Sequence, residues 1–223
     1  MEVRIISYSQ PPKEGLYVGE NVQELIAYCA RVSNPDNQQN TETSEKLLKY
    51  LIREKHWSPF EMVSVCLEIT TTRDIARQML RHRSFSFQEF SQRYADPTTS
   101  LKHVTREARL QDYNNRQNSI EVEDTALDQS WRGQQDLVWL QAIKAYNWAM
   151  ERGIAKEQAR CVLPEGLTES RLYMNGTLRS WLHYIDLREK NGTQKEHIEI
   201  ARACAEVITQ VFPMGESYLA PPR

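Results

Sequence analysis

The segment from Arg81 to Tyr94 carries the densest set of chemically capable side chains in the sequence. It reads RHRSFSFQEFSQRY and combines three arginines and a histidine with a glutamate, serines and interleaved aromatic rings. A guanidinium group binds phosphate through two hydrogen bonds and stacks on flat rings. Serine hydroxyls can donate to phosphate oxygens, and a glutamate can accept from sugar hydroxyls. The segment therefore predicts a site for a flat, phosphorylated ligand.

Three arginines lead into this segment at helical spacing. A helix over residues 73–83 would place Arg73, Arg77 and Arg81 on one face, because side chains four residues apart are neighbours on a helix. Residues 73–93 hold five arginines and one histidine against two carboxylates. We interpret this stripe as a face that meets an anionic ligand, rather than as an ordinary solvated helix face, because almost no acidic partners lie one turn away.

A second basic cluster lies downstream. Arg160 belongs to an amphipathic piece that a proline ends, and Arg179 and His183 share a face of the next predicted helix, with Arg188 just beyond. A lone helical histidine is more often structural than functional. Its pairing with an arginine, which is costly to bury without an anion, favours a functional reading of this face.

The elements that must position these residues form a mixed, helix-rich pattern. Residues 62–71 alternate, with Val63, Val65, Leu67 and Ile69 on one face, which is typical of a strand with one buried side. A short β-branched run predicts another strand over residues 3–8. Apolar residues at helical spacing predict helices over residues 21–32, 44–54, 73–83, 135–150, a stretch after Ile154, 178–187 and 195–211.

Two stretches lack a clear period. Residues 85–94 are expected to be extended or irregular, and residues 96–134 read as a polar excursion that contains one helix. Without repeats or low-complexity tracts, the chain is expected to form a single domain over residues 1–223.

Composition and charge exclude several classes of protein. The 223 residues carry a net charge of −2, with 40% hydrophobic and 26% charged residues, which argues against a nucleic-acid coat or an anionic membrane surface. The N-terminus lacks an apolar leader, and no run reaches the roughly 18 apolar residues of a membrane span. The four cysteines show no metal-binding spacing and are expected to be buried free thiols. We therefore expect a cytoplasmic protein with neither a nucleic-acid, a membrane nor a metal partner.

Several of these segments also match a known family. Arg81-His82-Arg83 is followed, after seven residues, by Ser91, and this pattern resembles the signature of the flavin-dependent thymidylate synthases. Residues 56–61 (HWSPFE), 76–78 (ARQ), 159–164 (ARCVLP) and 178–181 (LRSW) with 187–188 (LR) resemble further blocks of that family. The matching pieces span residues 20–211, which is most of the chain.

The resemblance implies a fold, an assembly and a reaction. The fold would be α/β (α+β), with a central, mostly antiparallel sheet flanked by helices, in a homotetramer whose subunits share active sites. The reaction would be the reductive methylation of dUMP to dTMP. The implied carbon donor is 5,10-methylenetetrahydrofolate, and the implied reductant is NADPH, acting through bound FAD.

The resemblance also implies roles for individual residues. Arg188 matches the arginine that polarises the uracil ring. The positions that match dUMP contacts are Gln78, Met79, Leu80, Arg81, Glu89, Phe90, Ser91, Gln92, Arg93, Arg160 and Arg188. The positions that match FAD contacts are Ser58, Arg81, His82, Arg83, Glu89, Thr177, Leu178, Arg179 and His183.

Alternatives remain open at this point. Ser91 could be a nucleophile, but nothing in the sequence fixes a base beside it, so we favour phosphate binding. A nucleotide-binding flavin reductase would share the flavin but would not transfer a methyl group. An RNA- or nucleotide-binding module could use the same arginines and phenylalanines, although the overall acidic balance counts against it.

Overall fold

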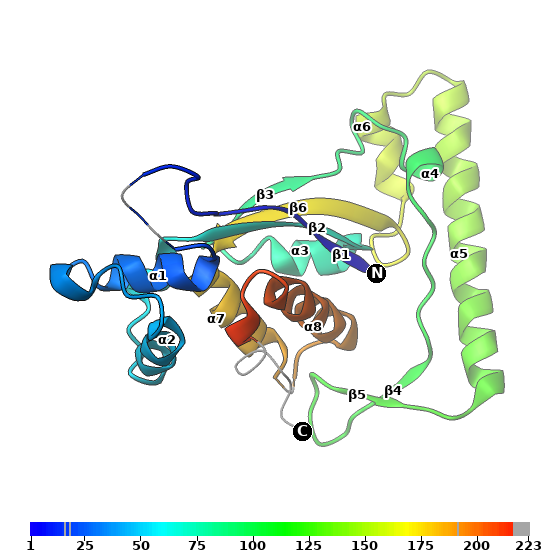
Figure 1. Ribbon diagram of the computed structural model, residues 1–223. Helices are drawn as coiled ribbons and strands as arrows, with labels where there is room; N and C mark the ends of the chain where they lie inside the picture. Colours follow the sequence, from blue (N-terminus) through cyan, green and yellow to red (C-terminus); the bar gives the residue numbers. More distant parts are fainter. Residues whose placement is uncertain (16, 18, 191, 216–223) are drawn as a thin grey trace.

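A four-stranded antiparallel sheet forms the centre of the computed structural model, which describes residues 1–15, 17, 19–190 and 192–215 (Figure 1). The strands lie in the order β1-β2-β6-β3. Their bounds are Glu2–Tyr8 for β1, Ser64–Thr72 for β2, Ser86–Glu89 for β3 and Glu169–Thr177 for β6. Each neighbouring pair is antiparallel, which confirms the expected mixed fold with a central antiparallel sheet.

The β2–β6 pair is the middle of the sheet. Its register runs without interruption from Ser64 opposite Thr177 to Thr72 opposite Glu169. The predicted alternation of β2 is confirmed, because Val65, Leu67 and Ile69 are buried. These side chains need an apolar partner layer, and the helices provide it.

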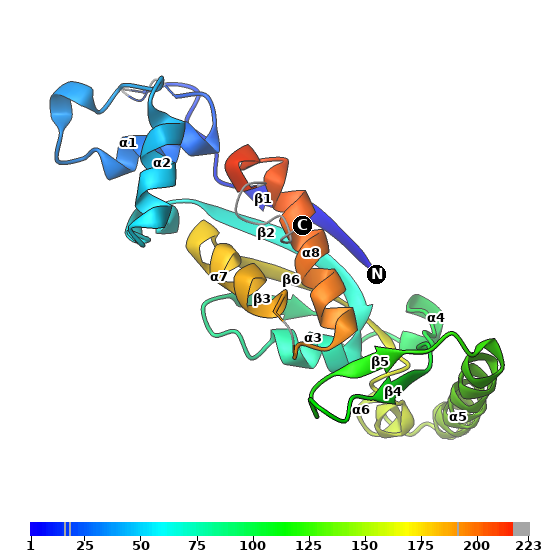
Figure 2. The ribbon, with the colours of Figure 1, turned by 90° about the horizontal axis from the view of Figure 1, so that it is seen from below.

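Helices α7 (Leu178–Arg188) and α8 (Lys195–Thr209) cover one face of the sheet (Figures 1 and 2). Trp181 and Tyr184 of α7 are buried in this layer, and Trp181 Nε1 donates to Val65 O at 3.0 Å. Near one end of the sheet lie α1 (Val22–Ala30) and α2 (Ser44–Arg53). All four helices were expected from their apolar periodicity, within a few residues at each end.

Strand β6 was not predicted from the sequence. Its buried positions are Ser170, Leu172, Met174 and Gly176, so that half of the inward side is not hydrophobic. Gly176 is required by packing, because a Cβ at this position would lie 2.4 Å from the Phe85 ring. The apolar alternation that identified β2 is therefore interrupted at both ends of β6.

The excursion over residues 96–134 holds more structure than the single expected helix. It contains a short helix α4 (Pro97–Ser100), a hairpin of β4 (Arg109–Gln111) and β5 (Ser119–Glu121), and the first part of α5 (Thr125–Glu151). Asp124 caps α5 by accepting from Leu127 N at 2.9 Å, so this helix begins ten residues before the expected start at residue 135. Helix α5 stands apart from the sheet in Figure 1.

The remaining elements are short. Helix α3 (Arg73–Met79) ends four residues before the expected residue 83, and α6 (Lys156–Ala159) is the short helix that follows Ile154. The 3-10 helices are η1 (Pro35–Asn37), η2 (Ser58–Glu61), η3 (Arg160–Val162) and η4 (Pro213–Gly215). Across the described residues, we find no helix with the length and apolar character of a membrane span.

The expectation of buried cysteines holds for one residue. All four thiols are free, but Cys161 is exposed, Cys29 and Cys66 are half-buried, and Cys204 is buried. Cys161 lies in η3, which sits at the surface beside α5. The apolar neighbours in its sequence are therefore no guide to its burial.

The close contact at Gly176 leads to a test of the fold. Gly176→Ala should lower the free energy of unfolding by about 1–3 kcal/mol, because the Phe85 ring must move away from the new methyl group. Gly133→Ala is the matched control, since a Cβ there meets nothing within 4 Å inside α5. The control should be neutral or stabilising, by up to about 1 kcal/mol. Urea unfolding measures both, and a Gly176 variant as stable as the control would contradict this packing.

Candidate functional site

The Arg81–Arg83 tripeptide sits on a turn that two buried residues hold in place. Met79 closes α3 and is fully buried, and His82 N donates to its carbonyl at 3.0 Å. Phe85 packs on the other side, with its ring 4.8 Å from that of Trp181. The turn is therefore anchored at both ends, and the His82 ring lies against Tyr184 and Arg188 of α7.

His82 and Arg188 form the central contact of this region. Arg188 Nε donates to His82 Nε2 at 2.9 Å, which places the proton of the neutral ring on Nδ1. Burial, followed by the charges of Arg188 and Arg81, lowers the pKa of His82 to about 4. The ring also stands edge-on to Tyr184, with centroids 4.8 Å apart. A neutral acceptor thus orients Arg188 while leaving its charge uncompensated.

Eight of the nine residues that match flavin contacts lie close together in this one chain, whereas Glu89 lies at the opposite end of α3, beside Arg73. Arg179 forms an ion pair with Glu61 of η2, and the His183 ring lies 4.7 Å from that of Trp57. Ser180 Oγ donates to Ser84 O at 3.3 Å, which joins the start of α7 to the basic turn. The contacts bring together η2 with Ser58, the turn with Arg81, His82 and Arg83, and the helix start with Thr177, Leu178, Arg179 and His183.

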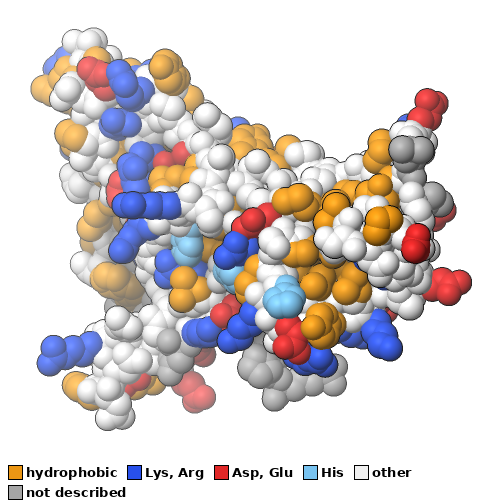
Figure 3. All heavy atoms as spheres, turned by 90° about the vertical axis from the view of Figure 1, so that its left-hand side faces the viewer, with side chains coloured by type: hydrophobic (Ala, Val, Ile, Leu, Met, Phe, Trp, Pro, Cys, Tyr) orange, Lys and Arg blue, Asp and Glu red, His pale blue; other side chains and the backbone are white. Residues whose placement is uncertain are grey.

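This face has the chemistry of an anion site with an apolar floor. Basic side chains and histidines gather near its middle in Figure 3. Arg81 and Arg83 are exposed and form no ion pair with any residue in the described part of the chain. Burial, and then Arg179, lower the pKa of His183, so this ring is also neutral near pH 7. Unpaired guanidinium groups beside aromatic rings fit a flat ligand with phosphate groups, such as FAD.

The residues that match dUMP contacts fall into two groups within the chain. Gln78, Met79, Leu80, Arg81 and Arg188 lie at the C-terminal end of α3. Glu89 lies at its N-terminal end, where it is 3.4 Å from Arg73 and accepts from Ser170 Oγ at 2.8 Å. A seven-residue helix is about 10 Å long, and the two groups are separated by that length.

The second group continues away from the basic turn. Arg93 forms an ion pair at 2.9 Å with Glu157 of α6 and is preceded by Phe90, Ser91 and Gln92. Arg160 lies in η3, directly after α6. Gln92 is buried, and its Nε2 has no hydrogen-bond partner among the described residues. The side chains of Met79 and Leu178 lie in the core, so only their backbone atoms can face a ligand.

The predicted stripe of unpaired arginines on α3 is wrong for two of its three members. Arg73 is buried and forms ion pairs with Glu89 and, at 3.5 Å, with Glu165. Arg77 also pairs with Glu165, at 3.3 Å. These acidic partners come from distant parts of the sequence rather than from the same helix. Arg81 lies beyond the end of α3, and it alone of the three stays unpaired among the described residues.

The sequence did not reveal a buried polar cluster behind Gln78. Its amide contacts His197 and Gln194, and His197 in turn contacts Tyr184. Gln78 and His197 are 119 residues apart, so no local spacing could connect them. The only hint in the sequence is a histidine within the first turn of a helix with a strong apolar stripe.

Two neutral histidines, His197 buried and His82 half-buried, make the stability depend on pH. Burial, followed by the charges of Arg188 and His82, lowers the pKa of His197 to about 3, and that of His82 is about 4. In the unfolded chain the pKa of both histidines returns to about 6.5. The unfolded state therefore binds more protons than the folded state at pH values below about 6.5 and above the folded pKa values. The free energy of unfolding should therefore fall as the pH decreases from about 6.5 towards 4.

Melting curves between pH 7.5 and 5 would measure this effect. The melting temperature should decrease across the range, and it should decrease less in the His197→Asn variant, which has lost one of the two titrating rings. An equal decrease in both proteins would show that His197 does not contribute.

Comparisons with known proteins show to which family this chain is similar. A family model described as "Thymidylate synthase complementing protein" matches residues 17–214. A probable flavin-dependent thymidylate synthase of Paramecium bursaria Chlorella virus 1 is 50% identical over 214 residues, or 96% of each chain. The flavin-dependent thymidylate synthase of Synechocystis sp. is 50% identical over 215 residues, again 96% of each chain.

A solved structure shares the fold. It is that of a UMP/dUMP methylase, PolB, from Streptomyces cacaoi bound with 5-Br dUMP, with a TM-score of 0.77 at 24% identity. The match covers 97% of this chain and 93% of that one. The family model and the two near full-length relatives show that the chain belongs to the flavin-dependent thymidylate synthase family.

Proposed function

We propose that this chain catalyses the reductive methylation of dUMP to dTMP in dTMP biosynthesis. The carbon donor would be 5,10-methylenetetrahydrofolate, and the reductant would be NADPH, acting through bound FAD. The observation that carries the proposal is the Arg188–His82 contact, which presents a cation next to the residues that match flavin contacts. FAD, when bound, would supply the hydride carrier that the amino-acid side chains lack.

Arg188 would act on the uracil ring. The C5 atom of uracil is a poor nucleophile until electron density is pushed into the ring, and a nearby cation favours the N3-deprotonated form that does so. Arg188 already uses its Nε to donate to His82, and its terminal nitrogens have no partner among the described residues. The neutral state of His82 matters because a protonated ring could not accept this bond.

The remaining substrate positions would hold the nucleotide. Ser91, Gln92, Arg93 and Arg160 would supply hydroxyl, amide and guanidinium donors to the phosphate, for which arginine is well suited. Gln78, Arg81 and Glu89 would contact the rest of dUMP, joined by backbone atoms of Met79 and Leu80 and by Phe90. Ser58, Arg81, His82, Arg83, Glu89, Thr177, Leu178, Arg179 and His183 would hold FAD.

A homotetramer with shared sites would reunite the two groups of dUMP residues. Within one chain the groups lie at opposite ends of α3. In addition, α5 exposes a series of large apolar side chains that a monomer would leave in water, namely Leu127, Trp131, Leu137, Val138, Leu140 and Trp148. The first feature supports a site in which one subunit provides Arg188 and another provides Arg93, and the second supports assembly through α5.

The reaction itself is the first test. The protein should form dTMP from dUMP, methylenetetrahydrofolate and NADPH under low oxygen, and product formation should require FAD. Arg188→Ala should lower kcat about 100-fold or more while FAD stays bound, because an electrostatic group at the reacting ring is lost. Arg202→Ala, an exposed arginine of α8, is the control and should keep full activity.

Failure would take distinct forms in this test. A protein that binds FAD and dUMP and oxidises NADPH without forming dTMP would be a nucleotide-binding flavin reductase. Full activity in the Arg188 variant would remove this residue from the mechanism while leaving the reaction in place.

Shared sites can be tested by mixing inactive variants. Arg188→Ala and Arg93→Ala should each be inactive alone, because each removes one group from every site. Subunit exchange between them should restore part of the activity, since some sites in mixed oligomers then carry both arginines. Mixed oligomers that form but stay inactive would contradict a site built from two chains.

A further inference from the structure

A fully buried histidine stands behind Gln78 and belongs to neither set of ligand-matching residues. His197 lies in the first turn of α8 and has no exposed surface. Its Nε2 is 3.0 Å from the Tyr184 hydroxyl, and its Nδ1 is 3.2 Å from Gln78 Oε1. A polar ring buried at this depth is held by both of its nitrogens, so its partners determine which nitrogen carries the proton.

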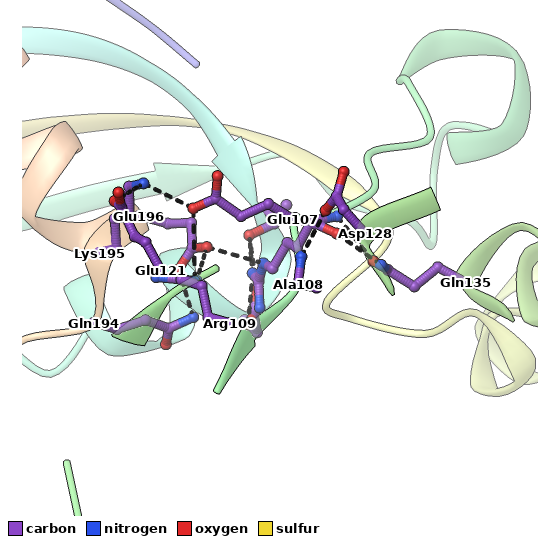
Figure 4. A network of polar contacts seen from close by, with 12 residues as sticks. Glu107, Ala108, Arg109, Glu121, Asp128, Gln135, Gln194, Lys195 and Glu196 are labelled. Atoms are coloured by element: carbon purple, nitrogen blue, oxygen red, sulfur yellow. Dashed lines mark hydrogen bonds and ion pairs between the residues drawn. The ribbon is translucent and has the colours of Figure 1, made fainter. Parts of the chain in front are cut away.

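The chain of contacts continues from Gln78 to a charged end. Gln78 Nε2 donates to Gln194 Oε1 at 2.9 Å, and Gln194 Nε2 donates to Glu196 Oε2 at 2.9 Å. The other carboxylate oxygen of Glu196 accepts from Arg109 in an ion pair that is largely buried on both sides. Figure 4 shows Gln194, Glu196 and Arg109 together beside the start of α8.

The carboxylate sets the direction of every bond in this chain. An ionised Glu196 can only accept, so Gln194 must turn its NH₂ group towards it and its oxygen towards Gln78. Gln78 must then donate to Gln194, which leaves its own oxygen facing His197. The neutral His197 therefore carries its proton on Nδ1 and accepts from the Tyr184 hydroxyl at Nε2. One charge thus selects one of the two orientations of the Gln78 amide.

We propose that Glu196, Gln194 and His197 are positioning residues that hold the Gln78 amide in the orientation in which it serves dUMP as a hydrogen-bond donor. This inference rests on the proposed function, in which Gln78 contacts dUMP. One hydrogen of the Gln78 amide is used by Gln194 and the second remains for the substrate, whereas the amide oxygen is occupied by His197. An amide free to turn over would present the wrong group half of the time.

The same chain gives the excursion over residues 96–134 a role. Arg109 reaches Glu196 from β4, and the neighbouring Arg106 binds both oxygens of Asp74 on α3, at 2.7 and 2.8 Å. The excursion is thereby bonded to α3 and to α8, the two helices that contribute Gln78 and His197. Arg106 and Arg109 are therefore polar residues of the excursion with defined partners in the rest of the fold.

Two substitutions of His197 separate positioning from simple stability. His197→Asn places an NH₂ group where Nδ1 was, which retains the bond to Gln78. His197→Gln places its amide near the position of Nε2, which retains the bond to Tyr184 and loses the bond to Gln78. Both variants should melt at a lower temperature. The Kd for dUMP on the FAD-loaded protein, measured by calorimetry, should stay near wild type for Asn and rise about tenfold for Gln.

A second pair of variants tests the charged end without altering the core. Glu196→Gln keeps the shape of the side chain, but its amide can donate as well as accept. The direction of the hydrogen bonds from Gln194 to Gln78 is then no longer fixed. This variant should raise the Kd for dUMP about tenfold and leave FAD binding unchanged. Glu121→Gln is the matched control, because Glu121 pairs with Lys195 beside the chain without belonging to it. This control should bind dUMP as the wild type does.

The possible results distinguish the positioning role from the proposed function. Wild-type dUMP affinity in both His197→Gln and Glu196→Gln would overturn the positioning role alone. An equal loss of affinity in His197→Asn and His197→Gln would assign His197 to stability only and also overturn it. Absence of dUMP binding by the unaltered protein would overturn the proposed function and this inference with it. If the His197 variants do not fold, the comparison of Glu196→Gln with Glu121→Gln decides.

Discussion

The pairing of β2 with β6 is the constraint on which the site depends. Each strand runs directly into a helix, β2 into α3 at Arg73 and β6 into α7 at Leu178. Because the strands are antiparallel, these helices start at opposite ends of the pair. The nine paired positions span about 27 Å at about 3.4 Å per residue, and the two helices have a combined length of about 27 Å at 1.5 Å per residue. Their C-terminal ends therefore meet, and Arg188 reaches His82 at that point.

Burial at this meeting point has an electrostatic consequence. Desolvation and nearby arginines hold both His82 and His197 neutral. A neutral imidazole can accept one hydrogen bond and donate another. His197 does both, through Nε2 and Nδ1, and His82 accepts from Arg188 at Nε2. The basic charge of the region thus remains on the arginines, where it is available to an anionic ligand. The histidines act as oriented hydrogen-bonding groups rather than as further cations.

The division of the dUMP-matching residues also follows from the sheet. β3 pairs with the outer side of β6, so the chain after Glu89 leaves the sheet near the start of α3 and away from its end. Residues that are ten positions apart in the sequence, such as Arg83 and Arg93, consequently belong to different regions of the molecule. Helix α5 packs against α6 and η3 on that second side and exposes several large apolar side chains.

The sequence by itself determined the local features of this protein. The apolar periods identified β2 and the helices around it, and the motif residues carried the family resemblance that the comparisons confirmed. Strand β6 was not predicted because Ser170 and Gly176 occupy inward positions, where the space left by neighbouring side chains rather than hydrophobicity determines the residue. Only the tertiary structure decided which charges are compensated, as with Arg73 and Glu165, and which residues stand behind Gln78. Local patterns report how one segment meets water, whereas ion pairs and buried hydrogen bonds join residues across more than a hundred positions, and their partners exist only once the sheet has formed.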